Sequence, residues 1–366
     1  MFLTPYLASW TKQEISILEE IGHVVRFLYT YEYGSTKYRR YIVIQYLANL
    51  IATVKMGIEA VPLCLKSDLI YCWFVFPTGV LAVVLGKFLR RAVILNAVGS
   101  DVACLPSINY GAVLKWYYKP LISWALRNAT KVVAISQDSA HWATKWSARH
   151  VSVVYEGIDT KKFKPSHRKK QEEKREFLLL TVSPLEKKAI LRKDLESLLR
   201  ALNDVVKKFA NVRLMIVGKK ENGYRIIRRT AKDLKLDKQV FFTDYIPHHE
   251  LAELYQQCDI FVLPSLHEGF PTVCAEAQAC GRPVITTNVS SIPEVIENMK
   301  SGVLVNVKSP RELANAIIQL LDDENLRHRM GTYGRKLIVA KFSKDIRRER
   351  MSEVLESLGF GVETQV

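Results

Sequence analysis

Closely spaced cysteines are missing from this sequence. The six cysteines of the 366-residue chain stand singly, without a C-x-x-C pair and without a cysteine and histidine cluster at zinc-site spacing. The sequence therefore predicts neither a disulfide-stapled scaffold nor a structural metal. A reducing, cytosolic setting is expected.

A signal peptide and a clear membrane span are missing as well. The first ten residues, MFLTPYLASW, do not follow the basic-then-apolar order of a signal peptide, so export is not expected. Residues Leu69 to Gly86 form an uncharged stretch of 18 residues, which is the lower limit for a spanning helix. Because Pro77 and Gly79 divide this stretch into an extended run and a helical run, we interpret it as two buried elements of a soluble core.

Acidic residues are few relative to basic ones. The chain has 53 Lys and Arg against 37 Asp and Glu, which gives a formal charge of +16. Its first 165 residues contain 19 Lys and Arg against 10 Asp and Glu. Such an excess predicts an anionic partner, which can be a nucleic acid, an anionic lipid or a phosphorylated small molecule. No nucleic-acid-binding motif accompanies the charge, so the charge alone does not choose among these partners.

Apolar strands alternate with helices in two successive series. This order predicts an α/β protein with two Rossmann-like doubly wound parallel-sheet domains facing across a cleft. A charged, proline-containing segment at residues 161–175 is the expected linker, since it lacks apolar periodicity. The predicted domains are residues 1–165, residues 166–343, and a last helix in 344–366 that extends the second domain or crosses back to the first. Among the expected elements are a helix over 80–89 and strands over 177–182 and 260–263.

The segment Pro264 to Gly281, PSLHEGFPTVCAEAQACG, carries the most informative pattern. A strand leads into a loop and then into a helix that begins near Pro271. Backbone N–H groups at the start of this helix, together with its positive end, predict an anion site that suits a diphosphate. Glu268 and Glu276 flank that start, and carboxylates accept hydrogen bonds from sugar hydroxyls. The alternatives are that Glu268 only complements the helix dipole and that Glu276 lies on a solvated face.

With this motif the sequence resembles the retaining nucleotide-sugar glycosyltransferases of the two-domain GT-B type, glycosyltransferase family 4. The family pattern is E-x7-E followed by A-x-A-x-G, which corresponds here to Glu268, Glu276 and the segment Ala277 to Gly281. The resemblance spans nearly the whole chain and is stronger in the second half.

The resemblance implies roles for individual residues. Glu268 would contact the donor sugar near its reacting carbon, and Lys193 would neutralise the leaving diphosphate; these two are the predicted catalytic residues. Glu276 would hold the ribose hydroxyls, and backbone amides of the loop would face the diphosphate. The predicted donor-binding residues are Glu276, Gly269, Phe270, Pro271, Thr272, Ser183, Asp101 and Ser100. No metal ligand is predicted.

The sequence departs from the family pattern at three places. Pro184 stands where the family commonly has an arginine, and Val98 stands where many members have a histidine. The usual Gly-Gly near the N-terminus is replaced by residues Tyr6 to Thr11. Asn96, Ser100 and Asp101 are candidates to take over part of the role of the missing histidine.

The chemistry implied by the resemblance needs no metal and no cofactor. Breaking the bond to a nucleoside diphosphate places negative charge on the leaving group, which a lysine and a helix N-terminus can stabilise. No D-x-D motif for a divalent cation is present. The family implies retention of the anomeric configuration with assistance from the leaving group, rather than a hydrolase-like pair of carboxyl groups.

Basic and aromatic residues are interleaved in the first half, at residues 29–46 and 115–131. Such segments are typical of an anionic bilayer surface, although the same side chains also serve in ordinary packing. We therefore expect a cytoplasmic protein, peripheral on the inner face of the membrane. His248 and His249 precede a helix and are interpreted as cap and surface residues.

The leading hypothesis is a glycosyltransferase that moves a sugar from a nucleotide-diphosphate-sugar donor to a lipid-linked or cell-envelope glycan acceptor. Two alternatives remain. One is a nucleotide-sugar epimerase on the same architecture, which needs no acceptor. The other is a non-catalytic protein that binds a sugar nucleotide or nucleic acid, although nucleic acid is not the expected partner.

Overall fold

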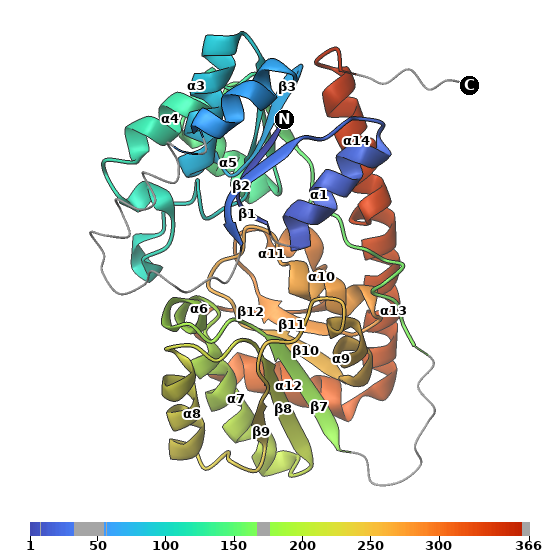
Figure 1. The fold of residues 1–366 in the computed structure, drawn as a ribbon. Coiled ribbons are helices and arrows are strands. Elements are labelled where there is room, and N and C mark those ends of the chain that lie inside the picture. Colours follow the sequence, from blue (N-terminus) through green and yellow to red (C-terminus); the bar gives the residue numbers. More distant parts are fainter. Residues whose placement is uncertain (8, 33–54, 56, 167–175, 361–366) are drawn as a thin grey trace. The chain divides into compact units, whose positions relative to one another are not determined.

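The computed structural model describes residues 1–7, 9–32, 55, 57–166 and 176–360 of the chain (Figure 1). Contacts between residues divide it into two units. The first contains Met1–Tyr155 together with Arg347–Val366, and the second contains Glu156–Ile346. The contacts thus divide the chain ten residues before the boundary expected from the sequence, and they group the last helix with the first unit from Arg347 onward.

The first unit is built on one parallel sheet. Its six strands are β1 (Phe2–Leu7), β2 (Phe27–Glu32), β3 (Leu69–Trp73), β4 (Ala92–Ala97), β5 (Lys131–Ala134) and β6 (Val151–Val153). They are ordered β2-β1-β3-β4-β5-β6 and every pair is parallel. Its helices are α1 (Ser9–Glu20), η1 (Val75–Gly79), α3 (Val80–Leu89), η2 (Pro106–Ile108), η3 (Ala112–Leu114), α4 (Lys119–Asn128), α5 (Gln137–Lys145) and α14 (Lys344–Glu356). The uncharged stretch 69–86 is thus a buried strand and most of a helix, as predicted.

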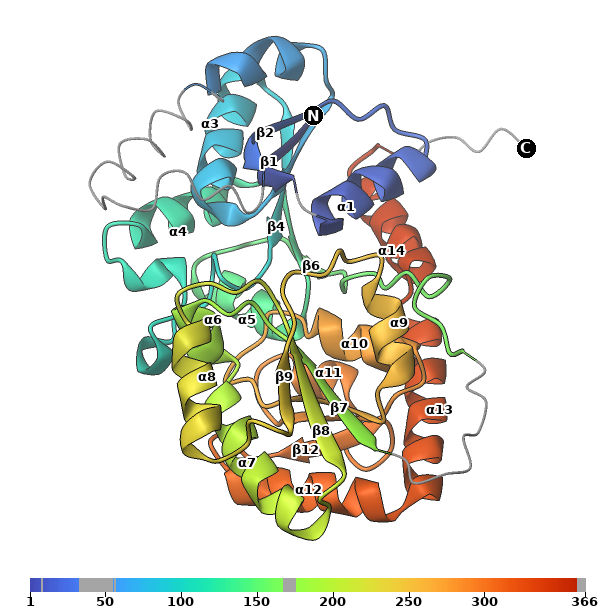
Figure 2. The ribbon, with the colours of Figure 1, turned by 60° about the horizontal axis from the view of Figure 1, so that its bottom comes forward.

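The second unit repeats the architecture. Its strands are β7 (Phe177–Val182), β8 (Val212–Val217), β9 (Val240–Phe242), β10 (Ile260–Leu263), β11 (Val284–Thr287) and β12 (Gly302–Val305). Its helices are α6 (Lys187–Arg192), α7 (Leu195–Lys208), α8 (Tyr224–Asp233), α9 (Leu251–Gln257), α10 (Thr272–Ala279), α11 (Ile292–Val295), α12 (Pro310–Asp322) and α13 (Glu324–Lys341). Helices α7 and α12 lie side by side (Figures 1 and 2). Two doubly wound parallel sheets confirm the predicted fold class.

Strand order in the second unit positions the candidate site. The order β12-β11-β10-β7-β8-β9 runs outward in both directions from β7 and β10. Successive connections leave these two strands toward opposite edges, which opens a crevice beyond their carboxyl ends. The loops after Val182 and Leu263 meet at that point.

The expected linker is only partly a linker. Phe163 is buried, and its ring lies 5.9 Å from that of Tyr255 and 5.2 Å from that of His248. Ile158 pairs with Ser343 in the same unit. Residues 156–166 therefore pack into the second unit, because one aromatic side chain anchors an otherwise charged segment. Residues 167–175 of the expected linker lie outside the described part of the chain.

Helix α14 is tied to the first unit by a buried arginine. The guanidinium of Arg347 donates to both carboxylate oxygens of Glu14, at 2.7 and 3.0 Å, and to the carbonyls of Val154 and Tyr155. Met351, Val354 and Leu355 pack in a hydrophobic cluster with residues of α1, β3, β4 and β5. No helix among the described residues has the length and apolar character needed to cross a bilayer.

We expect Arg347→Ala to destabilise the fold strongly. The substitution leaves the Glu14 carboxylate buried without its cation, and losing one partner of a buried ion pair costs about 3–5 kcal/mol. Urea unfolding of the full chain measures the effect. Arg350→Ala is the matched control, because Arg350 pairs with Glu353 at the surface and should cost less than about 1 kcal/mol. Equal losses in the two variants would contradict this account of α14.

Candidate functional site

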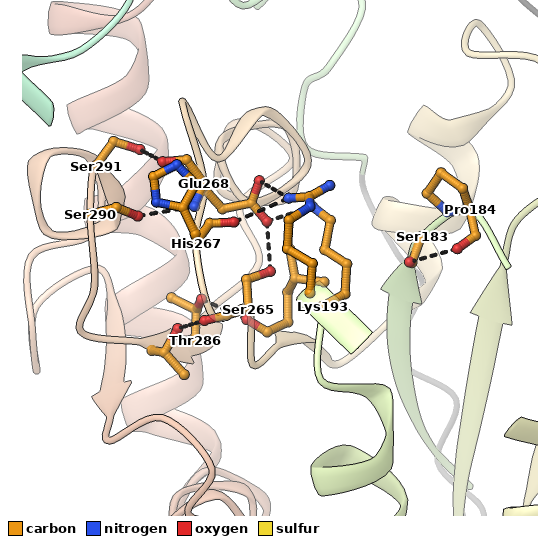
Figure 3. A network of polar contacts seen from close by, with 12 residues as sticks. Ser183, Pro184, Lys193, Ser265, His267, Glu268, Thr286, Ser290 and Ser291 are labelled. Atoms are coloured by element: carbon orange, nitrogen blue, oxygen red, sulfur yellow. Dashed lines mark hydrogen bonds and ion pairs between the residues drawn. The ribbon is translucent and has the colours of Figure 1, made fainter. Parts of the chain in front are cut away.

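A buried ion cluster lies beyond the carboxyl ends of β7 and β10 in the second unit. Glu268, in the loop after β10, accepts a hydrogen bond from the Lys193 ammonium at 2.5 Å and faces the Arg192 guanidinium at 3.3 Å. The Ser265 hydroxyl donates to the same carboxylate at 2.6 Å. Figure 3 shows Lys193, Ser265 and Glu268 turned toward one another. The two residues predicted to be catalytic, Glu268 and Lys193, are therefore direct partners.

Hydroxyl groups from the neighbouring strand and helix hold the backbone of this loop. The Glu268 amide donates to the Ser290 hydroxyl at 3.0 Å, and the Ser291 hydroxyl donates to the Glu268 carbonyl at 2.9 Å (Figure 3). Thr287 donates to the carbonyl of Ser265. Arg192 reinforces the loop from the other side by donating to the carbonyl of His267. The loop is thus fixed from both sides before any ligand binds.

Charge and burial set the protonation of the cluster. Burial alone would raise the pKa of Glu268, but Lys193, Arg192 and two side-chain hydrogen bonds outweigh burial and lower the pKa to about 2. Burial lowers the pKa of the Lys193 ammonium, and the facing carboxylate opposes that shift. Burial likewise lowers the pKa of His267 to about 4, so this imidazole is neutral at pH 7. Glu268 is a carboxylate at neutral pH and has no proton to donate.

The second predicted acid, Glu276, lies in helix α10 and has two partners of its own. Its Oε2 accepts a hydrogen bond from the Tyr255 hydroxyl at 2.9 Å, and its Oε1 lies 2.5 Å from Nε2 of His248. Glu276 is buried, so the interpretation as a solvated face residue is wrong. His248 is half-exposed, as a surface residue would be, but it also contacts Glu276, which the sequence did not predict; His249 is largely exposed, as expected.

The start of helix α10 differs in detail from the expectation. The helix begins at Thr272, and Pro271 takes the N-cap position instead of the first helical position. The Thr272 amide, predicted to face a diphosphate, donates to the carbonyl of Phe270 at 2.9 Å. The Phe270 ring is buried and lies 5.9 Å from that of Phe342. Gly269 connects Glu268 to this turn, and its role in diphosphate binding stays a prediction.

Ser183 follows β7 on the other side of the crevice. Its hydroxyl donates to the carbonyl of Pro184 at 3.1 Å, and Figure 3 shows both residues apart from the Glu268 network. A Cβ at Gly218, after β8, would lie 1.9 Å from the Ser183 carbonyl oxygen, so only glycine permits this close approach. Arg192 brings a cation to Glu268, and its role as a substitute for the family arginine missing at Pro184 stays a prediction.

Asp101 and Ser100 lie in the first unit, in the loop after β4. The Asp101 carboxylate is buried and accepts hydrogen bonds from the amides of Val75, Val98 and Gly99 at 2.7 to 3.0 Å. Burial raises the pKa of Asp101, and these amides oppose the shift. Asp101 therefore organises the loop that carries Ser100 and Val98. A donor-binding role for Ser100 and Asp101 stays a prediction.

No group of three or more His, Cys, Asp or Glu side chains suited to a metal ion is found among the described residues. All six cysteines are described and are free thiols. The prediction that no metal takes part in the reaction stays a prediction.

The two doubly wound units define the GT-B architecture. The Anabaena protein HepE, solved in complex with UDP, has this fold; it is 18% identical, with a TM-score of 0.76 over 97% of this chain and 99% of that one. Residues 162–337 match the family model described as Glycosyl transferases group 1. These residues include Lys193, Glu268 and Glu276, so this part of the second unit carries the sequence pattern of group 1 glycosyltransferases.

Curated glycosyltransferases are similar to part of this chain. A D-inositol 3-phosphate glycosyltransferase of Corynebacterium jeikeium is 31% identical over 221 residues, which cover 57% of this chain and 52% of that protein. The capsular polysaccharide biosynthesis glycosyltransferase CapM of Staphylococcus aureus is 29% identical over 238 residues, 63% of this chain and 61% of CapM. The chain thus spans about half the length of the first of these relatives.

We expect Glu268 to make the stability of the chain sensitive to acid. The pKa of Glu268 in the folded state lies below the ordinary value of 4.5. The contribution of this carboxylate to the free energy of unfolding is therefore complete above about pH 5 and is lost as pH falls toward 2. The loss amounts to about 3 kcal/mol. Glu268→Gln should be less stable than wild type at pH 7, and the difference should shrink as pH falls from 5 to 3. Urea unfolding across this range measures it, with the exposed Glu353→Gln as control; a constant difference would contradict the assigned ion pair.

Proposed function

We propose that this chain is a retaining glycosyltransferase of glycosyltransferase family 4, which moves a sugar from a nucleotide-diphosphate-sugar donor to a lipid-linked or cell-envelope glycan acceptor without a metal. The observation that carries the proposal is the buried cluster of Glu268, Lys193 and Arg192 beyond the ends of β7 and β10. A parallel sheet of this order binds its ligand at this place. The names of the curated relatives support glycosyl transfer.

The two cations of the cluster suit a departing diphosphate. A lysine ammonium has three hydrogen-bond donors, and only one is needed for the Glu268 contact at 2.5 Å. The remaining donors and the Arg192 guanidinium can meet the negative charge that develops as the glycosidic bond breaks. Because the site is buried, such contacts are stronger than they would be in water.

Glu268 fits a role at the sugar rather than one as an acid catalyst. With a pKa of about 2 it stays ionised at neutral pH, so it cannot protonate a leaving group as a hydrolase acid does. An ionised carboxylate can accept hydrogen bonds from donor hydroxyls and stabilise positive charge at the reacting carbon. This supports transfer assisted by the leaving group and argues against glycoside hydrolysis.

Donor turnover distinguishes the proposal from its alternatives. UDP sugars are the first donors to try, because HepE has been crystallised with UDP and with UDP-glucose. Release of nucleoside diphosphate that requires an added acceptor supports a transferase. Formation of an isomeric nucleotide sugar without acceptor would identify an epimerase, and tight binding without either product would identify a binding protein. Lys193→Met should lower kcat about 10²-fold or more, whereas Lys188→Met, at an exposed position of α6, should not.

His248 and Tyr255 should tighten nucleotide binding by orienting Glu276. Each contacts one carboxylate oxygen of Glu276, and a carboxylate has further lone pairs that can accept hydrogen bonds from the ribose hydroxyls. We expect His248→Ala to weaken UDP binding about 5- to 10-fold, which corresponds to the loss of one typical hydrogen bond of about 1 kcal/mol. Isothermal titration with UDP measures this effect. His249→Ala is the matched control, and equal affinity in both variants would remove His248 from the nucleotide site.

A further inference from the structure

The charged segment 161–175 is described as far as residue 166, so the surroundings of its first lysines are known. Lys161 and Lys164 are exposed, whereas Lys162 between them is half-buried. The basic and aromatic segment 29–46, by contrast, lies largely outside the described residues, and its expected membrane contact stays a prediction. The half-buried lysine of the linker segment is therefore the one whose contacts can be followed.

Lys162 reaches the candidate nucleotide site through a histidine. Its ammonium lies 3.5 Å from Nδ1 of His248, and Nε2 of the same imidazole lies 2.5 Å from Oε1 of Glu276. The imidazole thus stands in a row between a cation and a carboxylate. All three residues belong to the second unit.

The segment around Lys162 holds this lysine in place. Its amide donates to Oδ1 of Asp159 at 3.0 Å, and its ammonium lies 5.0 Å from the centre of the Phe163 ring. Phe163 is buried, and its ring lies 5.2 Å from that of His248. One aromatic side chain therefore packs against both the lysine and the histidine. Burial lowers the pKa of the Lys162 ammonium, whereas Glu276 and Asp159 oppose that shift.

The two neighbours of the imidazole decide which ring nitrogen carries the proton. An ammonium has only hydrogen-bond donors, so the ring nitrogen that faces Lys162 has to be the unprotonated one. A carboxylate has only acceptors, so the nitrogen that faces Glu276 has to carry the proton. Only the tautomer of His248 with its proton on Nε2 satisfies both neighbours.

Glu276 keeps free acceptor sites after its contacts with the protein are made. Its Oε2 accepts a hydrogen bond from the Tyr255 hydroxyl at 2.9 Å, and its Oε1 contacts His248. Burial and the charge of Glu276 hold the pKa of Tyr255 well above its ordinary value, so this hydroxyl stays a donor. A carboxylate offers about four lone-pair sites, which leaves one site on each oxygen. Two such sites match two neighbouring hydroxyls, as in a ribose.

We propose that Lys162 is a positioning residue of the nucleotide site. It selects the His248 tautomer that donates to Glu276, and the ring held in this way fixes the carboxylate for the hydroxyls of a ribose. In the other tautomer an unprotonated Nε2 would face the carboxylate, and the two sets of lone pairs would repel each other. Lys162 acts through the imidazole and has no assigned contact with the ligand. The inference rests on the proposed function, because it needs a nucleotide at Glu276.

Nitrogen NMR of the full chain with isotope-labelled histidine tests the tautomer without any nucleotide. The shifts of the two ring nitrogens distinguish protonated from unprotonated atoms, and His248→Ala assigns the signals. We expect wild type to carry the His248 proton on Nε2 only, and Lys162→Met to show a mixture of tautomers. Lys161→Met removes an exposed charge one residue away and should leave the spectrum unchanged. A proton on Nδ1 in wild type, or identical spectra of wild type and Lys162→Met, would overturn the proposal.

Isothermal titration with UDP measures the effect on binding. We expect Lys162→Met to weaken UDP binding about 3- to 5-fold, which corresponds to the loss of one weak hydrogen bond. Lys162→Arg keeps a donor toward Nδ1 and should restore most of the affinity, whereas Lys161→Met should bind as wild type does. In a His248→Ala background, Lys162→Met should cause no further loss, because the lysine acts through the imidazole. A full further loss in that background would mean a direct contact with the nucleotide and would refute the positioning role.

The two experiments separate failure of this inference from failure of the proposed function. If neither UDP nor GDP binds to wild type, the proposed nucleotide site is wrong, and the role of Lys162 at a ribose falls with it. If UDP binds to wild type and Lys162→Met with equal affinity, the role of Lys162 is wrong while the proposed function stands. Circular dichroism checks that each variant is folded.

Discussion

The structure of the site depends on the buried ion cluster around Glu268. An isolated carboxylate would not stay ionised in this environment, since burial alone disfavours its charge. Lys193 and Arg192, at the end of α6, supply the compensating charge and at the same time bind the loop after β10. One interaction therefore fixes the geometry of two loops from different strands. It also leaves cationic groups at the place where a doubly wound sheet receives an anionic ligand.

The sequence was most informative where apolar runs end at proline or glycine. The helix Val80–Leu89 and the strands Phe177–Val182 and Ile260–Leu263 have the predicted bounds, because each is a mainly apolar run that is bounded by charged residues, by proline or by glycine. Helix α13 was missed, since its apolar periodicity is weak and it contains two glycines. A Cβ at Gly331 would lie 2.0 Å from the carbonyl oxygen of Gly281. That glycine is required by a tertiary contact, which no local pattern reveals.

The site was predictable to the extent that its residues are close in sequence. Glu268 and Glu276 belong to one motif, and Lys193 was found by resemblance. His248 and Arg192 were missed as partners because the atoms they contact belong to residues 28 and 76 positions away. The Thr272 amide, which was expected to be free, donates a hydrogen bond to the carbonyl of Phe270 because the turn before α10 is tight. Sequence spacing identifies which groups gather in a loop, whereas tertiary packing decides which of their hydrogen bonds remain available.

The positive charge of the chain serves different purposes in different surroundings. In the core of the first unit, Arg347 is matched by a carboxylate and two carbonyls, so its charge is compensated within the fold. At the crevice, Lys193 and Arg192 share one carboxylate, which leaves an excess of positive charge for a phosphorylated ligand. Compensation of positive charge is thus complete in the core and partial at the ends of β7 and β10, where an external anion can meet the remaining charge.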